Sequence, residues 1–536
     1  MSRFLDSLQE SLSKSYSEIA KNYFLGATTG ESKYFEKSSK AQLEYDKTLT
    51  KEGVLNQLEL AKTNVDLSNE LRRTAEVLFL EAKSKNTSPQ LLEKSIEIQQ
   101  KIEEQFTKFR AEVNGKKLTD NKLEEILSTT RDRIIAKNHW QGSKEIGSLV
   151  KENLLDLVHT RNQIAKEAGY ENYHKMMLEL SEIEPENLDK IFDDLYHSTE
   201  EAYSEYKKDI DIHLCKKFSS DISELMPWHY GNRFFQEGPA IYSQDIDSVY
   251  NDKDIHSITK NFYDSIGLNI DPISENSDLH EREGKNQHAF CIDIDRDKRD
   301  IRVLCNIVPS HRWMDTDLHE FGHAAYDYYI DQNLPWAVKI HAHILVTEAI
   351  AMLFGRLAGN AAWINENVSS VDTTAFEEPL REQTALSQLV FSRWAQVMYN
   401  FEKELYANPN QDLQKLWWEL VNKYQKINIP TERLDSVKVA DWATKIHIAT
   451  VPCYYHNYQL GELLASQLIH HISDNISSQH IPFGSWKGHT EIGKYLKEEI
   501  FEKGRLLRWD DLIVNATGKP ITSESYTKDF CDKLKS

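Results

Sequence analysis

Long stretches of this chain repeat apolar residues at helical spacing, and this pattern limits the possible fold more than any other feature. Residues three and four apart share one face of an α-helix, so such a repeat predicts a helix with one apolar face. The clearest case spans residues 54–83, where the repeat consists of Leu58, Ala61, Val65, Leu71, Ala75, Leu78 and Ala82. Similar patterns fill 86–113, 144–168, 187–213, 373–407 and 457–475. We therefore expect a mainly α fold of antiparallel packed helices rather than a coiled coil that binds a partner.

One segment, residues 288–308, has the period of two that is typical of β-strands. In its first run Phe290, Ile292 and Ile294 fall on one face. After the polar stretch "DRDKRD", apolar residues alternate again at Ile301, Val303, Cys305 and Ile307. The pattern predicts one small antiparallel hairpin directly before the next helix.

The chain of 536 residues is long enough to form two or more lobes. We expect a first lobe mostly within 1–230, a second lobe mostly within 285–475 and a helical tail over 476–536, together forming a single functional unit. The sequence does not predict the oligomeric state.

The charge balance helps to exclude one class of partner. The chain has 64 Lys and Arg against 85 Asp and Glu, a formal net charge of −21. Nucleic-acid binding requires a basic surface, so we expect no nucleic-acid partner. A local basic patch remains compatible with this charge, so the charge of a substrate is left open.

The sequence also indicates in which cellular compartment the protein is located. The N-terminal residues "MSRFLDSLQESLSKSYSEI" contain no apolar run of the kind found in signal peptides. The most apolar segment, 343–364, carries His343, Glu348 and Arg356, which favours a buried helix over a membrane span. The five cysteines are scattered and odd in number, which is typical of free thiols in a reducing compartment. We expect a cytoplasmic protein without a membrane partner.

An H-E-x-x-H motif at His319, Glu320 and His323 predicts a metal site. On a helix the two histidines share a face and can bind one Zn²⁺ ion, and Glu320 is placed to act as a general base on water. A zinc site needs a third protein ligand, and we expect Glu348 to supply it from the apolar run downstream, where a lone carboxylate is costly unless it is paired or bound to a metal. The ordinary alternative for Glu348 is a buried carboxylate held by hydrogen bonds. Two histidines, one glutamate and an open position form a catalytic zinc site rather than a structural one.

These residues and several longer blocks resemble the angiotensin-converting-enzyme family of zinc dipeptidyl carboxypeptidases. The blocks are "QHAFCID…DIRVLCNIVPSHRWMDTDLHEFGHAAYDYY", "TEAIAMLFG", "ATKIHIATVPCYYHNYQLGELLASQL", "STTRDRIIAKNHW…EAGYENYHKMM" and "RWDDLIVNATGKPI". The resemblance implies a two-lobed helical zinc peptidase, with the zinc on the wall of a deep central channel that admits short flexible peptides. In this family the first helices cover the mouth of the channel.

The resemblance also implies roles for residues outside the motif. His447 and Tyr458 resemble the donors that stabilise the oxyanion of the reaction, although Tyr454 and Tyr455 lie near enough in sequence to compete with Tyr458 for this role. Lys445 and Tyr455 resemble the residues that hold the free C-terminal carboxylate of the substrate.

His288 and Ala289 resemble the residues that bind the substrate backbone along an edge strand, a peptide-binding mode known as strand addition. For His288 the ordinary alternative is a solvated histidine on a strand, and for Lys445 it is a surface lysine.

The chain departs from the family pattern at four places. No glutamine occurs at 226–232, where a third carboxylate-binding residue is expected, and Met352 replaces an aspartate of the second shell. Asn457 stands where chloride-activated members carry arginine, and Gln287 replaces a cysteine of the disulfide found in secreted members. These departures weaken the expectation of dipeptide products and argue against chloride dependence through that site.

Three functions therefore remain open. The first is a zinc peptidase that releases C-terminal dipeptides from short peptides. The second is an endo-acting oligopeptidase of the thimet type, a family that shares the H-E-F-G-H helix and a late His/Tyr block. The third is a peptide-binding protein without activity, against which the intact Glu320 argues.

Overall fold

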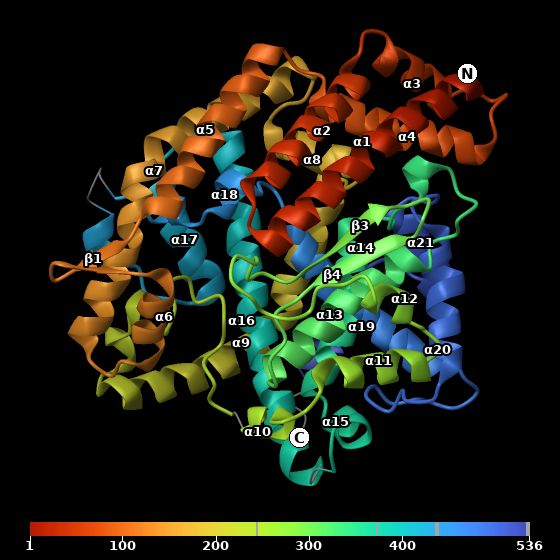
Figure 1. Ribbon diagram of the computed structural model, residues 1–536. Coiled ribbons are helices and arrows are strands. Elements are labelled where there is room, and N and C mark those ends of the chain that lie inside the picture. Colours follow the sequence, from red (N-terminus) through yellow and green to blue (C-terminus); the bar gives the residue numbers. More distant parts are fainter. Residues whose placement is uncertain (243–244, 371–372, 435–438, 532–536) are drawn as a thin grey trace. The chain divides into compact units, whose positions relative to one another are not determined.

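The computed structural model describes residues 1–242, 245–370, 373–434 and 439–531 (Figure 1). Helices hold 68% of the residues and strands 3%, which confirms the predicted mainly α class. The strands form two separate antiparallel pairs, β1–β2 and β3–β4, whereas the sequence predicted one hairpin.

The chain divides into two compact units, each built from three stretches of sequence. Unit 1 contains Met1–Asn86, Ser243–Arg381 and Leu460–Tyr526, and unit 2 contains Thr87–Tyr242, Glu382–Gln459 and Thr527–Ser536. The division at 1–230, 285–475 and 476–536 that we expected from the sequence follows chain order, and as a functional division it stays a prediction.

Unit 1 contains the residues of the predicted metal site and is built from helices, short 3-10 and π elements and one strand pair, with the following elements. In its first two stretches these are α1 (Ser2–Thr29), α2 (Ser32–Thr50), α3 (Val54–Lys62), α4 (Asn69–Lys85), α10 (Asp247–Tyr250), α11 (Ile255–Ser265), α12 (Asp271–Ser274), β3 (Phe290–Asp295), β4 (Asp300–Leu304), α13 (His311–Tyr328), η3 (Trp336–Val338), α14 (Ile344–Gly355), η4 (Arg356–Gly359) and α15 (Ala361–Asn367). In its third stretch they are α20 (Thr490–Tyr495), the π-helix η7 (Leu496–Ile500), η8 (Phe501–Lys503) and α21 (Trp509–Thr517). The helices α16 (Thr373–Ala407), α19 (Tyr455–Asn475) and α22 (Glu524–Phe530) contain residues of both units.

The first four helices form two packed pairs, α1 with α2 and α3 with α4 (Figure 1). Apolar residues of these helices share one core, which includes Leu12, Leu49, Leu58 and Leu78 and extends to Trp336. The helical spacing of apolar residues therefore selects buried faces here, as the sequence predicted.

The continuous helix expected over 54–83 is interrupted. The chain leaves the helix after Lys62, and α4 begins at Asn69 behind the N-cap Ser68, whose side chain accepts a hydrogen bond from the Leu71 backbone N–H. Val65 lies in this interruption and is 84% exposed. The local turn "NVDLS" outweighs the apolar period because Asn, Asp and Ser side chains offer backbone N–H groups a partner outside the helix.

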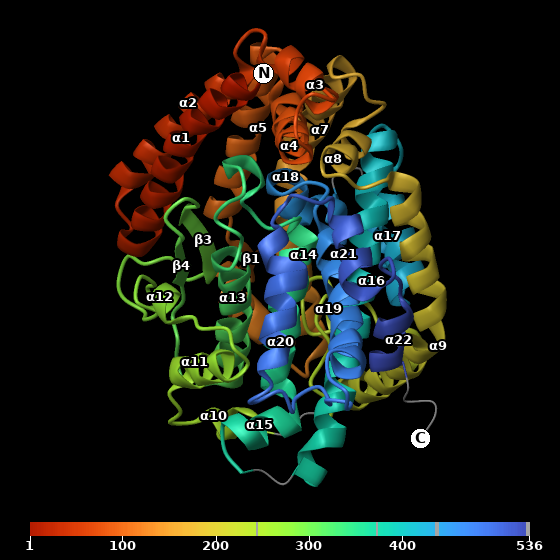
Figure 2. The same cartoon turned by 90° about the vertical axis from the view of Figure 1, so that its right-hand side faces the viewer.

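The predicted hairpin over 288–308 is confirmed as β3 and β4. Phe290 pairs with Leu304 and Asp293 with Ile301, and the register shifts between Asp293 and Asp295. One face of the hairpin packs on α1, where Phe290, Ile292 and Ile294 contact a cluster that includes Phe24 and Ala27. Figure 2 shows the hairpin beside α13, in agreement with the contacts between these elements.

Unit 2 is also helical. Its elements are α5 (Pro89–Lys108), β1 (Ala111–Val113), β2 (Lys116–Leu118), α6 (Asp120–Thr129), α7 (Arg133–Glu167), α8 (Tyr173–Leu180), α9 (Pro185–Phe218), η1 (Ile222–Glu224), η2 (Pro227–His229), α17 (Leu413–Gln425), η5 (Thr431–Arg433), η6 (Asp441–Thr444) and α18 (His447–Thr450).

The helix expected over 86–113 ends at Lys108, and its last residues form strand β1 instead. The cause is the Asn114–Gly115 pair, whose φ angles of 52° and 74° build the tight turn between β1 and β2. Asn-Gly is a strong hairpin signal because both residues tolerate positive φ. The helical reading of this segment was therefore wrong at its C-terminal end.

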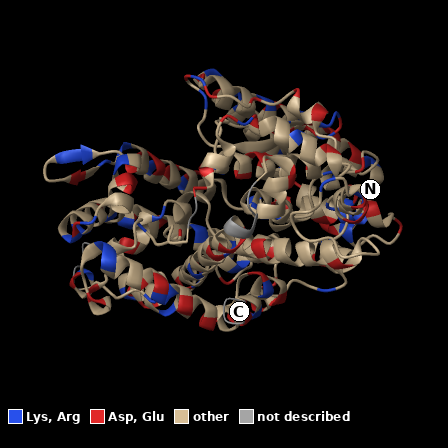
Figure 3. Cartoon of the chain, turned by 90° about the horizontal axis from the view of Figure 1, so that it is seen from below, with Lys and Arg blue, Asp and Glu red and all other residues tan. Residues whose placement is uncertain are grey.

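Two features concern the whole chain. Figure 3 shows acidic and basic residues distributed along the helices, so the net charge of −21 is not confined to one segment.

Among the described residues no single helix has the length and hydropathy of a membrane span. The pair Ile344–Gly359 and Ala361–Asn367, bent by 78°, passes this test by length and composition. Most residues of α14 in this pair are buried within the fold, as expected for 343–364.

Candidate metal centre

The metal-binding motif lies on α13. The helix begins behind the N-cap Ser310, whose side chain accepts a hydrogen bond from the Trp313 backbone N–H. His319 and His323 stand one turn apart, with their ring centroids 4.9 Å from each other. The predicted helix and the shared face of the two histidines are therefore present in the structure.

Helix α14 brings the third predicted ligand, Glu348, close to the histidines because α13 and α14 pack tightly. A Cβ atom on Gly322 would lie 3.0 Å from the Ala351 Cα, so a larger residue at this position would push the two helices apart by a few tenths of an ångström. The Glu348 Oε2 atom lies 3.9 Å from His319 Nε2 and 4.0 Å from His323 Nε2. One ligand atom from each of these three residues lies within 4.8 Å of the other two.

This group fits a zinc ion. Ligand atoms about 2.0–2.1 Å from zinc in tetrahedral geometry are about 3.3 Å apart, and the separations of 3.9 and 4.0 Å from Glu348 to the two histidines exceed this by less than 1 Å. The side chains of His319, His323 and Glu348 are 27%, 15% and 12% exposed, which leaves access for a fourth, non-protein ligand. Burial lowers the pKa of His319 to about 4 and that of His323 well below its usual value, so both imidazoles are neutral and able to bind a metal.

A second contact orients one of the ligands. The His323 Nδ1 atom lies 2.7 Å from the Thr347 hydroxyl oxygen, and Thr347 is 2% exposed. A hydrogen-bond partner on Nδ1 fixes the imidazole ring so that Nε2 faces Glu348. Met352 stands where the family resemblance implies an aspartate that orients the zinc histidines, and in the structure Thr347 contacts His323 instead.

Glu320 lies between the metal-binding group and the hairpin. It is 9% exposed, and burial, followed by the nearby Glu348, raises the pKa of its carboxyl to about 8, while a hydrogen bond from the Cys291 backbone opposes this shift. Strand β3 therefore holds the carboxylate beside His319 and His323. A carboxyl with a raised pKa near the metal ligands suits a proton acceptor and donor in catalysis.

His288 and Ala289 lie directly before β3, and His288 is exposed. The backbone N–H of His288 donates a hydrogen bond to the Asn286 side chain. Within the described part of the chain β3 pairs only with β4, so its other edge has no strand partner. This arrangement is compatible with strand addition by a peptide, and the role of both residues stays a prediction.

The other predicted site residues belong to unit 2. The rings of His447 and Tyr455 have centroids 5.4 Å apart, and the Tyr458 ring lies 5.6 Å from Tyr455 and 5.0 Å from Tyr454. Burial, with a smaller effect of Lys445, lowers the pKa of His447 to about 4. The buried Nδ1 atom of His447 has no hydrogen-bond partner among the described residues. Because the three tyrosines lie together in this cluster, each stays a candidate for the donor that stabilises the oxyanion.

Lys445 has a hydrogen-bond partner that was not predicted from the sequence. Its ammonium donates a hydrogen bond of 2.7 Å to Gln236 Oε1, and the rings of Phe234, Trp394 and Tyr455 lie 5.0–5.7 Å from it. Burial lowers the pKa of Lys445, which is 9% exposed, to about 8. The sequence predicted no glutamine beside Lys445, because none occurs at 226–232, whereas Gln236, four positions later, contacts Lys445.

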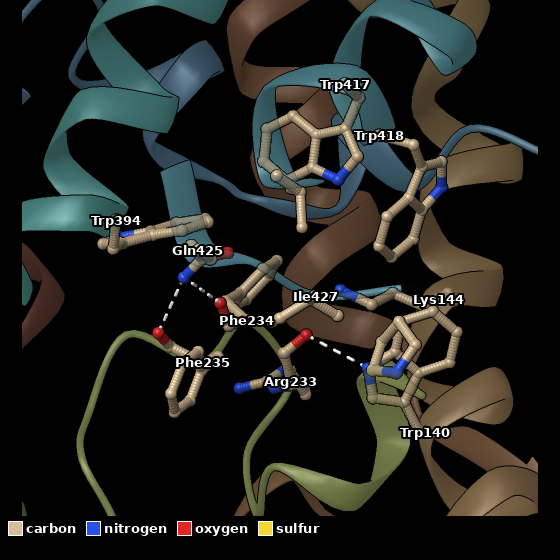
Figure 4. Close-up of a pocket in the computed structure, with 12 residues that line it drawn as sticks. Trp140, Lys144, Arg233, Phe234, Phe235, Trp394, Trp417, Trp418, Gln425 and Ile427 are labelled. Carbon is tan, nitrogen blue, oxygen red and sulfur yellow. Dashed lines mark hydrogen bonds between the residues drawn. The ribbon is translucent and has the colours of Figure 1, made fainter. Parts of the chain in front are cut away.

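The loop that carries Gln236 is fixed by distant side chains (Figure 4). The Trp140 indole N–H donates to the Arg233 carbonyl at 3.2 Å, and the Gln425 amide donates to the carbonyls of Phe234 and Phe235 at 3.2 and 2.8 Å. Phe235 has φ of 51°, a left-handed conformation that these bonds hold in place. The fold of unit 2 therefore places Gln236 beside Lys445.

The predicted site residues thus form two groups. His319, Glu320, His323, Glu348, His288 and Ala289 lie in unit 1, whereas His447, Tyr458, Lys445 and Tyr455 lie in unit 2. Helix α19 contains Tyr455 and Tyr458 near its start and continues into unit 1 from Leu460. The assignment of catalytic and substrate-binding roles to individual residues stays a prediction.

Two family models match the chain. Residues 1–229 match the family described as "Angiotensin-converting enzyme", and residues 393–534 match the family described as "Carboxypeptidase Taq (M32) metallopeptidase". The second family was not anticipated from the sequence. Neither match includes residues 230–392, which hold the metal-binding group. A comparison with curated proteins finds no match. Since both matched families are zinc metallopeptidases, these matches, together with the His-His-Glu group, identify the chain as a zinc metallopeptidase.

Proposed function

We propose that the enzyme releases dipeptides from the free C-termini of short, unstructured peptides. The observation that carries this specificity is the buried pair of Lys445 and Gln236, joined at 2.7 Å and surrounded by aromatic rings. An ammonium, an amide and the Tyr455 phenol form the donor set that a terminal carboxylate requires. A lysine in an apolar pocket is costly to bury, and a substrate carboxylate would offset this cost.

The chemistry follows from the residues at the metal-binding group. A zinc ion held by His319, His323 and Glu348 would lower the pKa of a water molecule and polarise the peptide carbonyl. Glu320 accepts the proton of the attacking water and then delivers it to the leaving amine. His447, neutral at pH 7, and Tyr458 donate hydrogen bonds to the carbonyl oxygen as negative charge develops on it.

The match to a carboxypeptidase family supports a second candidate, the release of single C-terminal residues. The two candidates share the zinc chemistry and the recognition of the terminal carboxylate. They differ in the distance between the carboxylate-binding residues and the metal, which sets how many residues fit between them.

Mass spectrometry of the products separates the candidates. Unstructured peptides of about five to fifteen residues are incubated with the zinc-loaded enzyme and, in parallel, with its Glu320→Gln variant. The proposal predicts successive losses of two residues from the C-terminus, seen only when Glu320 is present. Losses of one residue would establish the second candidate, and internal cuts would establish an endo-acting oligopeptidase. Absence of cleavage across a varied peptide set would contradict all three.

A further inference from the structure

A cavity in unit 1 is lined by none of the residues of the metal centre. Its volume is about 370 Å³. Helices α1, α2 and α4 form one part of its wall, and the turn after β3 together with η3 forms the other. A cavity of this size falls within the range of small-molecule sites.

The wall of this cavity is aromatic and apolar on several sides. Tyr16 from α1, Tyr45 from α2 and Trp336 from η3 supply rings, and Val77 and Leu78 from α4 add aliphatic surface. Such a lining accepts a planar or aliphatic body of a ligand.

Arg296 provides a buried cation in this wall. It is 8% exposed, and its guanidinium lies 4.5 Å from the Tyr16 ring centroid and 4.4 Å from that of Trp336. One terminal N–H group donates to the Trp336 carbonyl at 3.1 Å. Its Nε atom has no hydrogen-bond partner among the described residues, although it is buried. A buried guanidinium N–H without an acceptor is unusual and points to a missing partner.

The nearby acidic group does not neutralise Arg296 fully. Asp293 Oδ2 lies 3.8 Å from Arg296 Nε, beyond hydrogen-bond distance, and Asp293 Oδ1 also has no partner among the described residues. Burial raises the pKa of Asp293 to about 8 even though Arg296 opposes this shift, so the aspartate is largely protonated near pH 7. The positive charge of Arg296 is therefore available to an anion.

The lining also holds three other charged side chains. Arg505 and Lys85 contribute two cations, and Glu81 contributes one carboxylate, which accepts a hydrogen bond of 3.1 Å from the Tyr45 hydroxyl. Lys85 is also paired with Asp46, which lies outside the lining. With Arg296, the lining holds three cations against the one carboxylate of Glu81.

We propose that this cavity is a binding site for an amphipathic organic acid, with its carboxylate on Arg296 and its aromatic or aliphatic body against Tyr16, Tyr45 and Trp336. Arginine presents a planar fork of donors that matches a carboxylate, and its position between two rings orients that fork. Such a ligand would contact α1, α2 and α4 as well as the turn after β3, so it would stabilise the packing of the first helices on the hairpin.

The first test measures binding by calorimetry, with indole-3-acetate as the probe and indole-3-acetamide as its neutral analogue. The proposal predicts that the acid binds at least about tenfold more tightly than the amide, because a charge-assisted hydrogen bond contributes about 1.5–3 kcal/mol. The Arg296→Met variant should lose this preference. Arg302→Met is the matched control, because Arg302 lies on the same hairpin but pairs with Asp300 outside the cavity.

A second variant covers the case in which Arg296→Met does not fold. Lys85 lies on α4 with a side chain that is 25% exposed, so Lys85→Met should fold and weaken binding of the acid severalfold. Hydrogen exchange in α1 and α4 should slow when the acid is bound to the unmodified enzyme. Equal binding of acid and amide, an equal loss in Arg302→Met, or no binding at about 10 mM acid would overturn the proposal.

The carboxylate has two chemical sources, a separate small acid or an acidic side chain of a bound peptide. A peptide with one glutamate and an amidated C-terminus, added to the Glu320→Gln variant, distinguishes them. Competition with indole-3-acetate would assign the cavity to peptide side chains, and undisturbed binding of the probe would assign it to a separate acid.

Discussion

At the scale of single residues, the metal centre depends on a few side chains whose surroundings fix their protonation. The imidazoles of His319 and His323 are neutral because they are buried. Burial and the nearby Glu348 also raise the pKa of the Glu320 carboxyl. These effects act together, since a metal site needs neutral histidines and a general base needs a pKa near the working pH.

Glu320→Gln should lower peptide hydrolysis by about 10²- to 10⁴-fold, the usual contribution of general acid–base catalysis. The zinc content should remain unchanged, because the side chain is not one of the three ligands. Turnover and metal analysis are measured on the same sample, with Glu59→Gln on the exposed face of α3 as control. A loss of zinc together with activity would mean that Glu320 has a structural role instead.

Thr347→Val should reduce zinc affinity about 10- to 100-fold, because the hydroxyl that orients His323 is removed while the shape is kept. Thr347→Ser retains the hydroxyl and should stay close to the unmodified enzyme. Competition with a chelator measures both affinities. Equal affinity of the valine and serine variants would show that the 2.7 Å contact does not orient the ligand.

Glu402 in unit 2 makes stability depend on pH. It is 2% exposed and accepts a hydrogen bond from the Cys453 backbone N–H at 2.9 Å. Burial raises its pKa from 4.5 to about 7, although the Cys453 bond and Arg161 oppose this shift. A carboxyl whose pKa is raised by folding favours the folded state at low pH, and this contribution is lost as pH rises from about 4.5 to 7.

Glu402→Gln should therefore match the unmodified enzyme near pH 4.5 and exceed its free energy of unfolding at pH 8 by up to about 3 kcal/mol. Thermal and denaturant unfolding across this range measure the difference. Glu419→Gln, at an exposed position of α17, is the control and should follow the pH profile of the unmodified enzyme. Parallel profiles for both variants would contradict the assignment.

At the scale of elements, close packing of α13 and α14 brings the ligands together. Gly322 permits this packing, because a Cβ atom there would lie 3.0 Å from the Ala351 Cα and 3.3 Å from the Ile350 carbonyl oxygen. Both contacts involve backbone atoms of α14, so the neighbour cannot move aside without moving the helix that carries Glu348.

Gly322→Val should destabilise unit 1 by about 1–3 kcal/mol, as overpacked cores do, and should reduce zinc binding because Glu348 is displaced. Gly359→Val serves as the control, since a Cβ atom there meets only His311 Nε2 at 3.7 Å, an ordinary contact. Urea unfolding and metal analysis test both variants. Full zinc binding in Gly322→Val would show that the helices tolerate a wider separation.

Elements also show what sequence patterns can and cannot predict. The period of apolar residues predicted α16 over 373–407 and the hairpin around β3 and β4, because these patterns reflect burial of one face. It missed the break before α4 and the β1–β2 hairpin, where short polar turns determine the backbone. Both places contain turn-forming residues, and these determine the backbone more strongly than the period of apolar residues does.

The shared face of His319 and His323 could be predicted because their spacing on one helix is a local property. Gln236 could not, because its position depends on hydrogen bonds from Trp140 and Gln425, which lie 93 and 190 residues from their partners in the loop. Thr347 was missed for a similar reason, since its contact with His323 arises from the packing of two helices.

At the scale of the whole molecule, the predicted site residues are divided between the two units. Unit 1 holds the metal-binding group and Glu320, and unit 2 holds Lys445 with Gln236. The proposed function requires both, because cleavage at a fixed distance from the C-terminus needs a metal centre and a carboxylate-binding site. Recognition of the terminal carboxylate is therefore the central claim.

The most direct test is the ratio of kcat/KM for a peptide with a free C-terminal carboxylate to that for the same peptide with a C-terminal amide. We predict a ratio of about 10 to 100, corresponding to a charge-assisted hydrogen bond from Lys445. The ratio should approach one in Lys445→Met and should fall above about pH 8, where Lys445 loses its charge. Equal rates for the acid and the amide in the unmodified enzyme would contradict the account.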